Sequence, residues 1–521
     1  NDIIDLEQPG AMFVSQHPTQ DNLTFNALDA KLNLQTNELI ADGVYLIKTA
    51  DAAIRPEPAQ ITLHPGAQMD TIEKATIVFN MENRMHRVFD ARVHIASAKL
   101  YSANGYINYK DAENHSTPIF FKEITSATGY SVGYADISKD EPLNLSSAFK
   151  FFGEVSVIAP DSSMSFDGGV TLALNCNDNE PYLRFKAKID PANICIPISE
   201  APTDVDGKRI TTSILFDENN LKPIVAFFTS DKEADNVFIK AQGFLTYDKK
   251  SNEYRIASKE KLADMESMGD YLSINKTSCK AKGQGNIQLG LPLGGVIKTN
   301  NYGEIKASAG NEENVNIRMT LALNFPFSVE ALDIMGKNMA DDMNLPEIEF
   351  EKSRYHNFLN YIYGEEKAEA LFQDLIEHGD WENIPNELNY TLLLPDVNLN
   401  WDPVRSSYLG TSDVEVGIVG KHQINRKMKA RIQMVKSGIA TELRIYLEQD
   451  MDNWYYFSYN GASMSAVSSD ENFNDMVKNA KTKEFKGENG KIYTFRLAPE
   501  SDKRKFIRNI ELMNYEEGDE E

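Results

Sequence analysis

The chain has 521 residues, 41% of them hydrophobic and 10% aromatic, which is enough apolar material for packed cores and too much chain for a single one. The 53 basic and 78 acidic residues give a formal net charge of −25. A field of that sign repels phosphate backbones and argues against nucleic acid as a partner. No apolar run is long enough to cross a bilayer, so we expect no transmembrane segment.

Residues 1–145 are predicted to form a domain of β-repeats. Apolar and polar side chains alternate in short segments separated by turn residues, which places one face of each strand in a core and the other in solvent. An Asp followed by Ala recurs at the start of such segments, at residues 29–32, 51–54 and 90–93. This recurrence favours stacked β units over a single closed barrel.

Residues 146–325 show the same alternation with more glycine, and we expect a second β domain there. Glycines at residues 168–169, 283–285 and 294–295 lie at the predicted corners of this domain. The pair Gly283 and Gly285 lacks the third glycine and the following helix of a dinucleotide site, so it predicts no cofactor.

Residues 326–400 are predicted to be a helical segment. Ser328 can cap a first helix, which we expect to end before Pro346. The clearest helix follows Gly364, because the apolar residues of 368–376 recur at helical spacing and Gly379 stands at the C′ position. The apolar stripe of the first helix is Leu332, Met335, Met339 and Met343.

Residues 401–515 are predicted to form an antiparallel β meander plus one helix, followed by an acidic tail at 516–521. The helix lies near residues 473–480, after a capping cluster at 468–470. The expected fold is therefore mainly β, with stacked β-repeat or β-sandwich-like domains followed by a C-terminal α+β region.

The motifs of well-known catalytic and metal chemistries do not occur in the sequence. The eight histidines form no HxH, HExxH or HxxxH pair, and there is no GxSxG elbow, P-loop or CxxC motif. Residues 449–453 offer alternate oxygen ligands for calcium, but they are more simply interpreted as an acidic hairpin turn. Three cysteines exclude a disulfide framework and leave room for one bridge. We predict no cofactor, no metal and no catalytic residue.

Two groups of aromatic residues are candidates for a binding surface. Trp454, Tyr456 and Tyr459 belong to a predicted aromatic strand, whose alternate members must point outward unless a second layer covers them. Asp380 and Trp381 follow a helix end and resemble a sugar-binding edge, in which an aromatic face stacks on a pyranose. The competing interpretation is a tryptophan folded back onto the end of its helix.

Four phrases of the β-rich portion, residues 29–32 (DAKL), 67–69 (AQM), 89–93 (FDARV) and 243–248 (GFLTYD), carry a resemblance to a known family. Residues 20–320 resemble the OstA-like domains of lipopolysaccharide-transport proteins. The chain is also similar to segments of large envelope-associated proteins of Bacteroidota, whose O-glycosylation motif residues 70–72 (DTI) fit. The resemblance implies a periplasmic or outer-membrane-associated location and a scaffold or transport-related role.

The leading hypothesis is a non-enzymatic envelope scaffold or binding protein that recognises other envelope proteins or glycans through β surfaces, within a membrane-associated complex. The first alternative is a carbohydrate-active enzyme or carbohydrate-binding module with dispersed carboxylates. The second is lipid or amphiphile binding in a β groove. The chain begins at Asn1 without a methionine, which we interpret as a processed form or an excised piece of a longer protein.

Overall fold

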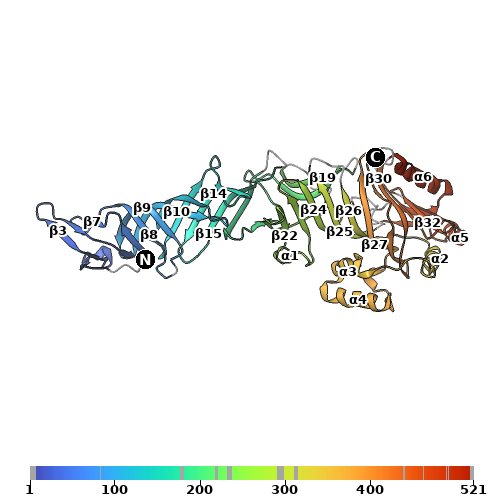
Figure 1. Cartoon of the computed structure of the whole chain (residues 1–521), viewed down its shortest axis with the longest axis horizontal. Coiled ribbons are helices and arrows are strands. Elements are labelled where there is room, and N and C mark those ends of the chain that lie inside the picture. Colours follow the sequence, from blue (N-terminus) through green and yellow to red (C-terminus); the bar gives the residue numbers. More distant parts are fainter. Residues whose placement is uncertain are drawn as a thin grey trace. The chain divides into compact units, whose positions relative to one another are not determined.

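The computed structural model describes residues 8–82, 84–175, 181–217, 221–230, 237–289, 298–309, 315–437, 440–461, 463–487, 490 and 492–516. Within these residues the fold is mainly β, with large antiparallel sheets and with most of the helices in the C-terminal part of the chain (Figure 1). The expected mainly-β fold class is confirmed. By its contacts the chain divides into two compact units.

Unit 1 lies within residues 1–174, 179–210 and 245–247. Its strands are β1 (Ala11–Val14), β2 (Thr24–Ala27), β3 (Asp29–Asn33), β4 (Glu38–Asp42), β5 (Ile47–Thr49), β6 (Ala52–Pro56), β7 (Gln60–Leu63), β8 (Ile72–Val78), β9 (Arg87–Ser97), β10 (Leu100–Lys110), β11 (Ser116–Thr125), β12 (Val132–Ile137), β13 (Leu143–Asn144), β14 (Phe149–Ile158), β15 (Met164–Leu172), β16 (Leu183–Ile189) and β17 (Ile196–Ile198), with one 3-10 turn, η2 (Pro18–Gln20). The main antiparallel sheet has the order β1, β2, β5, β6, β8, β9, β10, β11, β12, β14, β15, β16, with β13 beside β14. Strands β3, β4 and β7 form a second sheet.

The main sheet of unit 1 is rolled around its buried face. Asp51, beside β6, accepts hydrogen bonds from the backbone nitrogen and the hydroxyl of Ser131, beside β12, at 2.9 and 2.6 Å. His86 Nε2 lies 2.6 Å from the carbonyl oxygen of Asp161, in the turn between β14 and β15. Both contacts join strands that are far apart in the sheet order. The enclosed core includes Tyr101, Ile107, Tyr109, Phe121, Phe151 and Phe166, all buried.

Unit 2 contains the remaining strands and the α-helices of the described chain. The strands are β18 (Ile210–Phe216), β19 (Pro223–Ser230), β20 (Val237–Lys240), β21 (Gly243–Asp248, of which residues 245–247 belong to unit 1), β22 (Glu253–Ala257), β23 (Tyr271–Asn275), β24 (Lys280–Asn286), β25 (Lys298–Ser308), β26 (Asn316–Asn324), β27 (Leu392–Asp402), β28 (Ser407–Gly410), β29 (Val414–Val419), β30 (His422–Ser437), β31 (Ala440–Glu448), β32 (Trp454–Tyr459), β33 (Ser463–Ser468), β34 (Glu484–Lys486) and β35 (Ile492–Leu497). The helices are α1 (Lys259–Ala263), α2 (Val329–Ala340), α3 (Tyr355–Tyr363), α4 (Glu365–His378), α5 (Glu471–Asn479) and α6 (Glu500–Glu516), with 3-10 turns η3 (Phe350–Lys352) and η4 (Asn386–Leu388).

The large sheet of unit 2 runs from β22 to β28 in chain order and continues through β30, β31, β32, β33 and β35 to β34. Strand β29 pairs with β27 and β30, and a separate small sheet has the order β19, β18, β20. The expected meander corresponds to the antiparallel pairs β30–β31, β31–β32 and β32–β33. Strands β33 and β35 are parallel, because α5 crosses over between them.

Helices cover both faces of the sheet around β32. Phe473 of α5 packs on Phe457, with ring centroids 6.3 Å apart. Phe506 of α6 packs on Tyr456, with centroids 5.5 Å apart. Successive side chains of a strand point to opposite faces, so α5 and α6 lie on opposite sides of β32. This part of the molecule is therefore a three-layer arrangement of helix, sheet and helix.

The helix signals of the sequence correspond to real helix ends. Ser328 caps α2 by accepting a hydrogen bond from Ala331 N at 3.2 Å, although α2 ends at Ala340, so Met343 of the expected stripe lies beyond it and is exposed. Helix α4 ends at Gly379, which adopts the left-handed φ of 81°. Helix α5 is capped by Asp470. These three helices carry local cap signals that sequence can reveal.

The observed units differ from the expected domain limits. The expected boundary between residues 145 and 146 falls inside the main sheet of unit 1, where β12 and β14 pair directly. Richer glycine content changes the twist and corners of a sheet without ending it. Cys279, in the turn between β23 and β24, is disulfide-bonded, so the one bridge that the cysteine count allows is formed. Residue 516 ends α6, and the rest of the expected acidic tail, 517–521, lies outside the described residues.

Candidate functional site

The aromatic strand expected to present a binding surface is buried. Trp454 is 7% exposed, Tyr456 2% and Tyr459 1%. On one face the ring of Tyr456 is covered by α6, and Lys503 Nζ lies 4.0 Å from the ring centroid of Trp454. The structure corrects the expectation of an exposed surface here. Period-two alternation shows that a strand has two faces, but it does not reveal that helices cover both of them.

Asp380 and Trp381 are neighbours in sequence, but their side chains lie in different environments. Trp381 is 3% exposed, donates from Nε1 to the carbonyl oxygen of Leu371 at 2.8 Å, and packs edge-on against Tyr355. The tryptophan is thus folded back onto its own helix, as the competing interpretation holds, and offers no stacking face for a sugar. Asp380 is exposed and lies in the wall of a cavity.

That cavity, which we name the helix-end cavity, has a volume of about 670 Å³. Its walls come from four parts of unit 2: Ala340 at the end of α2, residues 347–352, the C-terminal end of α4 with residues 378–380, and residues 423–426 of β30. The segments are tied together, since Asn425 Nδ2 donates to the carbonyl oxygen of Gly379 at 2.9 Å and Ile348 N donates to the carbonyl oxygen of Asn425 at 3.2 Å. These hydrogen bonds hold the walls of the cavity in fixed positions relative to one another.

An exposed row of three aromatic rings lies on the outer face of unit 1. Phe89 of β9, Tyr106 of β10 and Phe120 of β11 occupy paired positions on adjacent strands. Ring centroids are 5.8 Å apart for the first pair and 5.1 Å for the second. Tyr106 is 37% exposed and Phe120 46% exposed. We call these three residues the aromatic row.

The surroundings of the aromatic row are polar and include two ion pairs. Arg92 Nε lies 2.9 Å from Glu73 Oε2, and Lys122 forms an ion pair with Asp136. Asn108 follows Tyr106 by two positions on β10, so it faces the same side. Phe89 and Asn108 also line a cavity of about 440 Å³. The row therefore offers ring faces and an amide next to a hollow.

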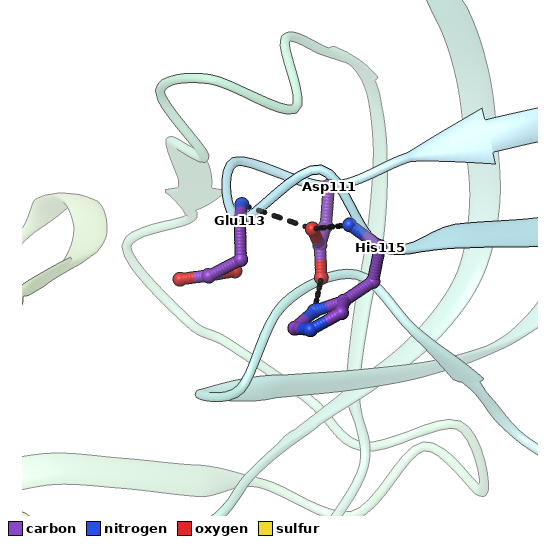
Figure 2. Close-up of side chains that lie close together, drawn as sticks. All are labelled: Asp111, Glu113 and His115. Carbon is purple, nitrogen blue, oxygen red and sulfur yellow. Dashed lines mark hydrogen bonds and ion pairs between the residues drawn. The ribbon is translucent and has the colours of Figure 1, made fainter.

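A cluster of Asp111, Glu113 and His115 lies in the turn between β10 and β11, with ligand-type atoms within 4.8 Å of one another (Figure 2). Asp111 Oδ1 accepts hydrogen bonds from the backbone nitrogens of Glu113 and His115, and Oδ2 lies 3.0 Å from His115 Nδ1. Burial opposes the charge of Asp111, but these hydrogen bonds outweigh it and lower its pKa. Both carboxylate oxygens are engaged in holding the turn, so we assign the cluster a structural role.

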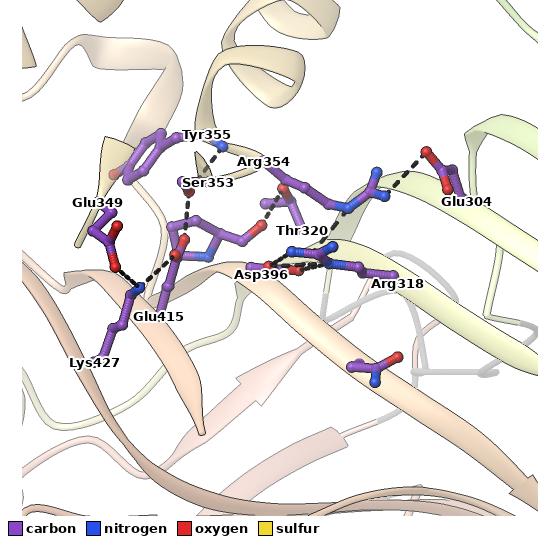
Figure 3. Close-up of polar contacts among 12 residues, drawn as sticks. Glu304, Arg318, Thr320, Glu349, Ser353, Arg354, Tyr355, Asp396, Glu415 and Lys427 are labelled. Carbon is purple, nitrogen blue, oxygen red and sulfur yellow. Dashed lines mark hydrogen bonds and ion pairs between the residues drawn. The ribbon is translucent and has the colours of Figure 1, made fainter. Parts of the chain in front are cut away.

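A second polar cluster fastens α3 to the sheet of unit 2 (Figure 3). Arg318 of β26 donates from Nε to both carboxylate oxygens of Asp396 of β27, at 2.8 and 3.1 Å. Arg354, next to α3 and 12% exposed at its side chain, places Nη2 3.0 Å from Glu304 Oε1. Its Nε lies 4.0 Å from Asp396 Oδ1, so the two arginines share one carboxylate.

Glu415 of β29 is the most deeply placed acid of this cluster, at 6% exposure. It accepts a hydrogen bond from the Ser353 hydroxyl, and Lys427 Nζ lies 4.0 Å from its Oε1. Burial raises the pKa of Glu415, and the Ser353 bond opposes that rise only in part. The arrangement anchors the helical hairpin α3–α4, which in turn supplies one wall of the helix-end cavity.

The calcium candidate at residues 449–453 has the geometry of a turn. Asp450 Oδ1 accepts hydrogen bonds from the backbone nitrogens of Asp452 and Asn453 at 2.7 and 2.8 Å. The hydrogen bonds from the Asn453 amide, together with these backbone bonds, lower the pKa of Asp450. An Asp that bonds the backbone two residues ahead is the ordinary chemistry of a tight turn, so the simpler interpretation accounts for these residues.

No protein-family model, no curated protein and no solved structure matches the chain. The two candidate sites are therefore interpreted from their own geometry. Sequence reasoning singled out Asp380 but missed the aromatic row. The row could have been found from aromatic residues at the outward-facing positions of predicted strands. Phe89 in residues 89–93 (FDARV) is one of them, because the alternation of apolar and polar residues places it toward solvent.

Proposed function

We propose that this chain is a non-enzymatic binding protein of the cell envelope that recognises glycans on the aromatic row of unit 1. The main observation behind this proposal is the row itself. Its three rings are stacked or tilted against one another at paired positions of adjacent strands, and Tyr106 and Phe120 are exposed. Rings that a sheet holds in place offer flat apolar faces at little entropic cost, which suits the apolar face of a sugar ring.

The electrostatics favour a neutral glycan over an anionic one. Two cations near the row, Arg92 and Lys122, are neutralised by Glu73 and Asp136, while Arg87 and Lys110 line the adjacent cavity. The whole chain carries −25 formal charges, which repel a polyanion at long range. The row offers a ligand its ring faces, the Asn108 amide and the adjacent cavity, whose lining also includes Arg87 and Lys110.

A lipid-binding groove receives less support. The inward-facing side chains of unit 1, such as Tyr101, Phe121 and Phe166, are 0% exposed and pack against one another in the described core. An acyl chain would have to displace these contacts at the cost that close-packed cores impose. Co-purified lipid detected by mass spectrometry would reverse this preference.

A location outside the cytoplasm is supported by the disulfide at Cys279. Structural disulfides persist in oxidising compartments such as the periplasm and are rare in the reducing cytosol. The proposed role within a membrane-associated complex agrees with the resemblance to envelope proteins. Among the described residues, no helix combines the length and apolarity needed to span a membrane.

The test is a binding screen of the full chain against neutral and anionic polysaccharides, with Tyr106→Ala and the double variant Tyr106→Ala/Phe120→Ala. We expect the double variant to bind about tenfold more weakly or worse, since aromatic contacts contribute roughly 0.5–1.5 kcal/mol each and 1.4 kcal/mol is a factor of about ten. Tyr130→Ala is the matched control, because Tyr130 is 55% exposed and lies outside the row. If Tyr106→Ala and the double variant bind the glycan as tightly as the parent and Tyr130→Ala do, the proposal is contradicted.

The carbohydrate-active enzyme alternative is separated from simple binding by product analysis. Any bound polysaccharide is incubated with the protein, and released oligosaccharides are measured by chromatography. A non-enzymatic binder leaves the polysaccharide intact. Turnover that is lost in Asp380→Ala would instead place catalysis at the helix-end cavity, where that carboxylate lies.

A further inference from the structure

The aromatic row runs straight across three neighbouring strands of unit 1. Tyr106 of β10 is paired directly with Phe89 of β9 on one side and with Phe120 of β11 on the other. The three rings therefore follow one another at right angles to the strands, with one ring on each strand. Their centroids are 5.8 and 5.1 Å apart. The row is thus a repeating feature, whose period is set by the spacing of the strands.

That period is close to the length of one sugar in an extended glycan. Neighbouring strands of a sheet lie about 4.8 Å apart. A pyranose that is linked through equatorial bonds at both ends, as in a β-1,4-glucan, advances the chain by nearly the same distance and keeps the chain straight. An axial bond, as in an α-1,4-glucan, turns the chain at every sugar. Only the straight chain can therefore place successive sugars over all three rings.

Polar side chains lie on both sides of the aromatic row, on the same face of the sheet. On one side, the exposed Arg92 of β9 is paired with the half-buried Asn104 of β10. On the other side, Asn108 follows Tyr106 by two positions along β10 and is exposed. Two positions of a strand span about 6.6–6.8 Å. A sugar that rests on the row would therefore direct its edges at these polar groups.

This arrangement suits a pyranose whose hydroxyl groups are equatorial. Such a sugar has two apolar faces, formed by axial C–H groups, and a polar rim. An asparagine amide donates and accepts hydrogen bonds, as a sugar hydroxyl does. An axial hydroxyl would instead press against an aromatic face and lose its hydrogen bonds to water. The cavity beside Asn108, whose lining also includes Arg87 and Lys110, leaves room for a substituent at one edge of the sugar.

We propose that the aromatic row binds a straight, neutral glycan of equatorially linked pyranoses, such as a β-1,4-glucan, which lies across β9, β10 and β11. The inference rests on the glycan binding proposed above and adds the linkage, the direction and the length of the bound segment. Phe89, Tyr106 and Phe120 stack on one sugar each. Asn104 and Asn108 contact the edges of these sugars.

The test is isothermal titration calorimetry of the full chain with cello-oligosaccharides and with malto-oligosaccharides of matched length. Both series are neutral chains of glucose, and they differ only in whether the linkage is equatorial or axial. We expect the trisaccharide and longer members of the cello series to bind at least about tenfold more tightly than their malto counterparts. Affinity in the cello series should rise about three- to tenfold from the disaccharide to the trisaccharide and then level off, because a fourth sugar extends past the row.

Variants assign the sugars to the rings. Phe120→Ala removes the ring at one end, so cellotriose should bind no more tightly than cellobiose, whose affinity should stay within about twofold of the parent value. Tyr106→Ala should weaken both ligands, because the middle ring contacts either of them. Asn108→Ala should weaken cellotriose, whereas Tyr130→Ala, which alters an exposed ring outside the row, should change neither. Circular dichroism of each variant checks its fold before titration.

The outcomes separate this inference from the proposed function. Malto-oligosaccharides that bind as tightly as the cello series, or an absence of cello-oligosaccharide binding at millimolar concentration, overturn the inference. Glycan binding on the row would still stand if the polysaccharide screen finds an axially linked glycan that Tyr106→Ala weakens. If neither Tyr106→Ala nor Phe120→Ala weakens the binding of any glycan, the inference and the proposed function both fail.

Discussion

Glu415 illustrates how one buried carboxyl group makes stability depend on pH. Its pKa is raised by burial, so the folded state binds the proton more tightly than the unfolded state does. The stability that Glu415 contributes is therefore fully present below the pKa of the unfolded chain. It is lost as pH rises through the folded pKa.

The corresponding prediction concerns Glu415→Gln, which keeps the acceptor for Ser353 but cannot ionise. We expect the variant to be more stable than the parent at pH 7 and no different near pH 4, measured by urea denaturation at both values. Asp413→Asn is the control, because Asp413 is an exposed carboxylate that lines the same cavity as Glu415, Arg318 and Asp396. An equal shift at both pH values would show that ionisation is not the cause.

Gly417 packs so closely against the Tyr355 hydroxyl group that a side chain at residue 417 would collide with it. A Cβ at Gly417 would lie 2.6 Å from the Tyr355 hydroxyl oxygen, which is closer than atoms approach without displacement. That hydroxyl is buried and has no hydrogen-bond partner among the described residues. The glycine is thus required by the docking of α3, and not by its own backbone conformation.

A double-mutant cycle tests this contact. Gly417→Ala should destabilise unit 2 by about 1–3 kcal/mol, as overpacking of a core does. Tyr355→Phe should be neutral or stabilising, because it removes an unsatisfied buried hydroxyl. In the Tyr355→Phe background the alanine should cost distinctly less, measured by chemical denaturation. Additive costs would mean that the hydroxyl is not what the new methyl group meets.

At the scale of elements, α6 decides whether the aromatic strand β32 is buried. Phe506 and Ile510 of α6 are 4% and 1% exposed and pack on Tyr446, Trp454 and Tyr456. We expect Phe506→Ala to cost about 3–5 kcal/mol and to shift the emission of Trp454 to longer wavelength. Lys505→Ala, on the exposed side of α6, should change neither stability nor emission.

The elements that sequence could predict are those with local signals. Helix α4 has helical spacing and a glycine at its end, and α2 and α5 have side-chain caps, so all three could be expected. Helices α3 and α6 were not predicted. Helix α3 is rich in aromatic residues and α6 in charged ones, and few capping residues mark the ends of either helix. Their amphipathic character becomes evident only against the sheet that they cover.

Candidate sites were harder to predict for a related reason. The aromatic row combines residues 89, 106 and 120, and the helix-end cavity combines residues 351, 380 and 425. Each set is assembled by strand register or helix docking across dozens of residues, which no linear motif encodes. Asp380 could be singled out because it follows a recognisable helix end, but its partners could not.

At the scale of the whole molecule, the division into two units predicts two unfolding steps. Trp381, Trp401 and Trp454 are all buried and all lie in unit 2, so tryptophan emission reports that unit alone. Far-ultraviolet circular dichroism reports strands of both units. We expect the two probes to give non-coincident urea transitions, as proteins that are not two-state do. Coincident transitions under all conditions would show that the units unfold as one.

The disulfide at Cys279 should act on only one of those steps. Cys279 lies between β23 and β24 of unit 2, and a native disulfide typically contributes about 2–4 kcal/mol by restricting the unfolded chain. We expect Cys279→Ser to lower the stability seen by tryptophan emission by about that amount and to leave the remaining circular-dichroism step in place. Reductant should lower the parent in the same way and leave the variant unchanged. If reductant weakened the variant as well, the effect would not come from this bridge, and the support that the bridge gives to a location outside the cytoplasm would be lost.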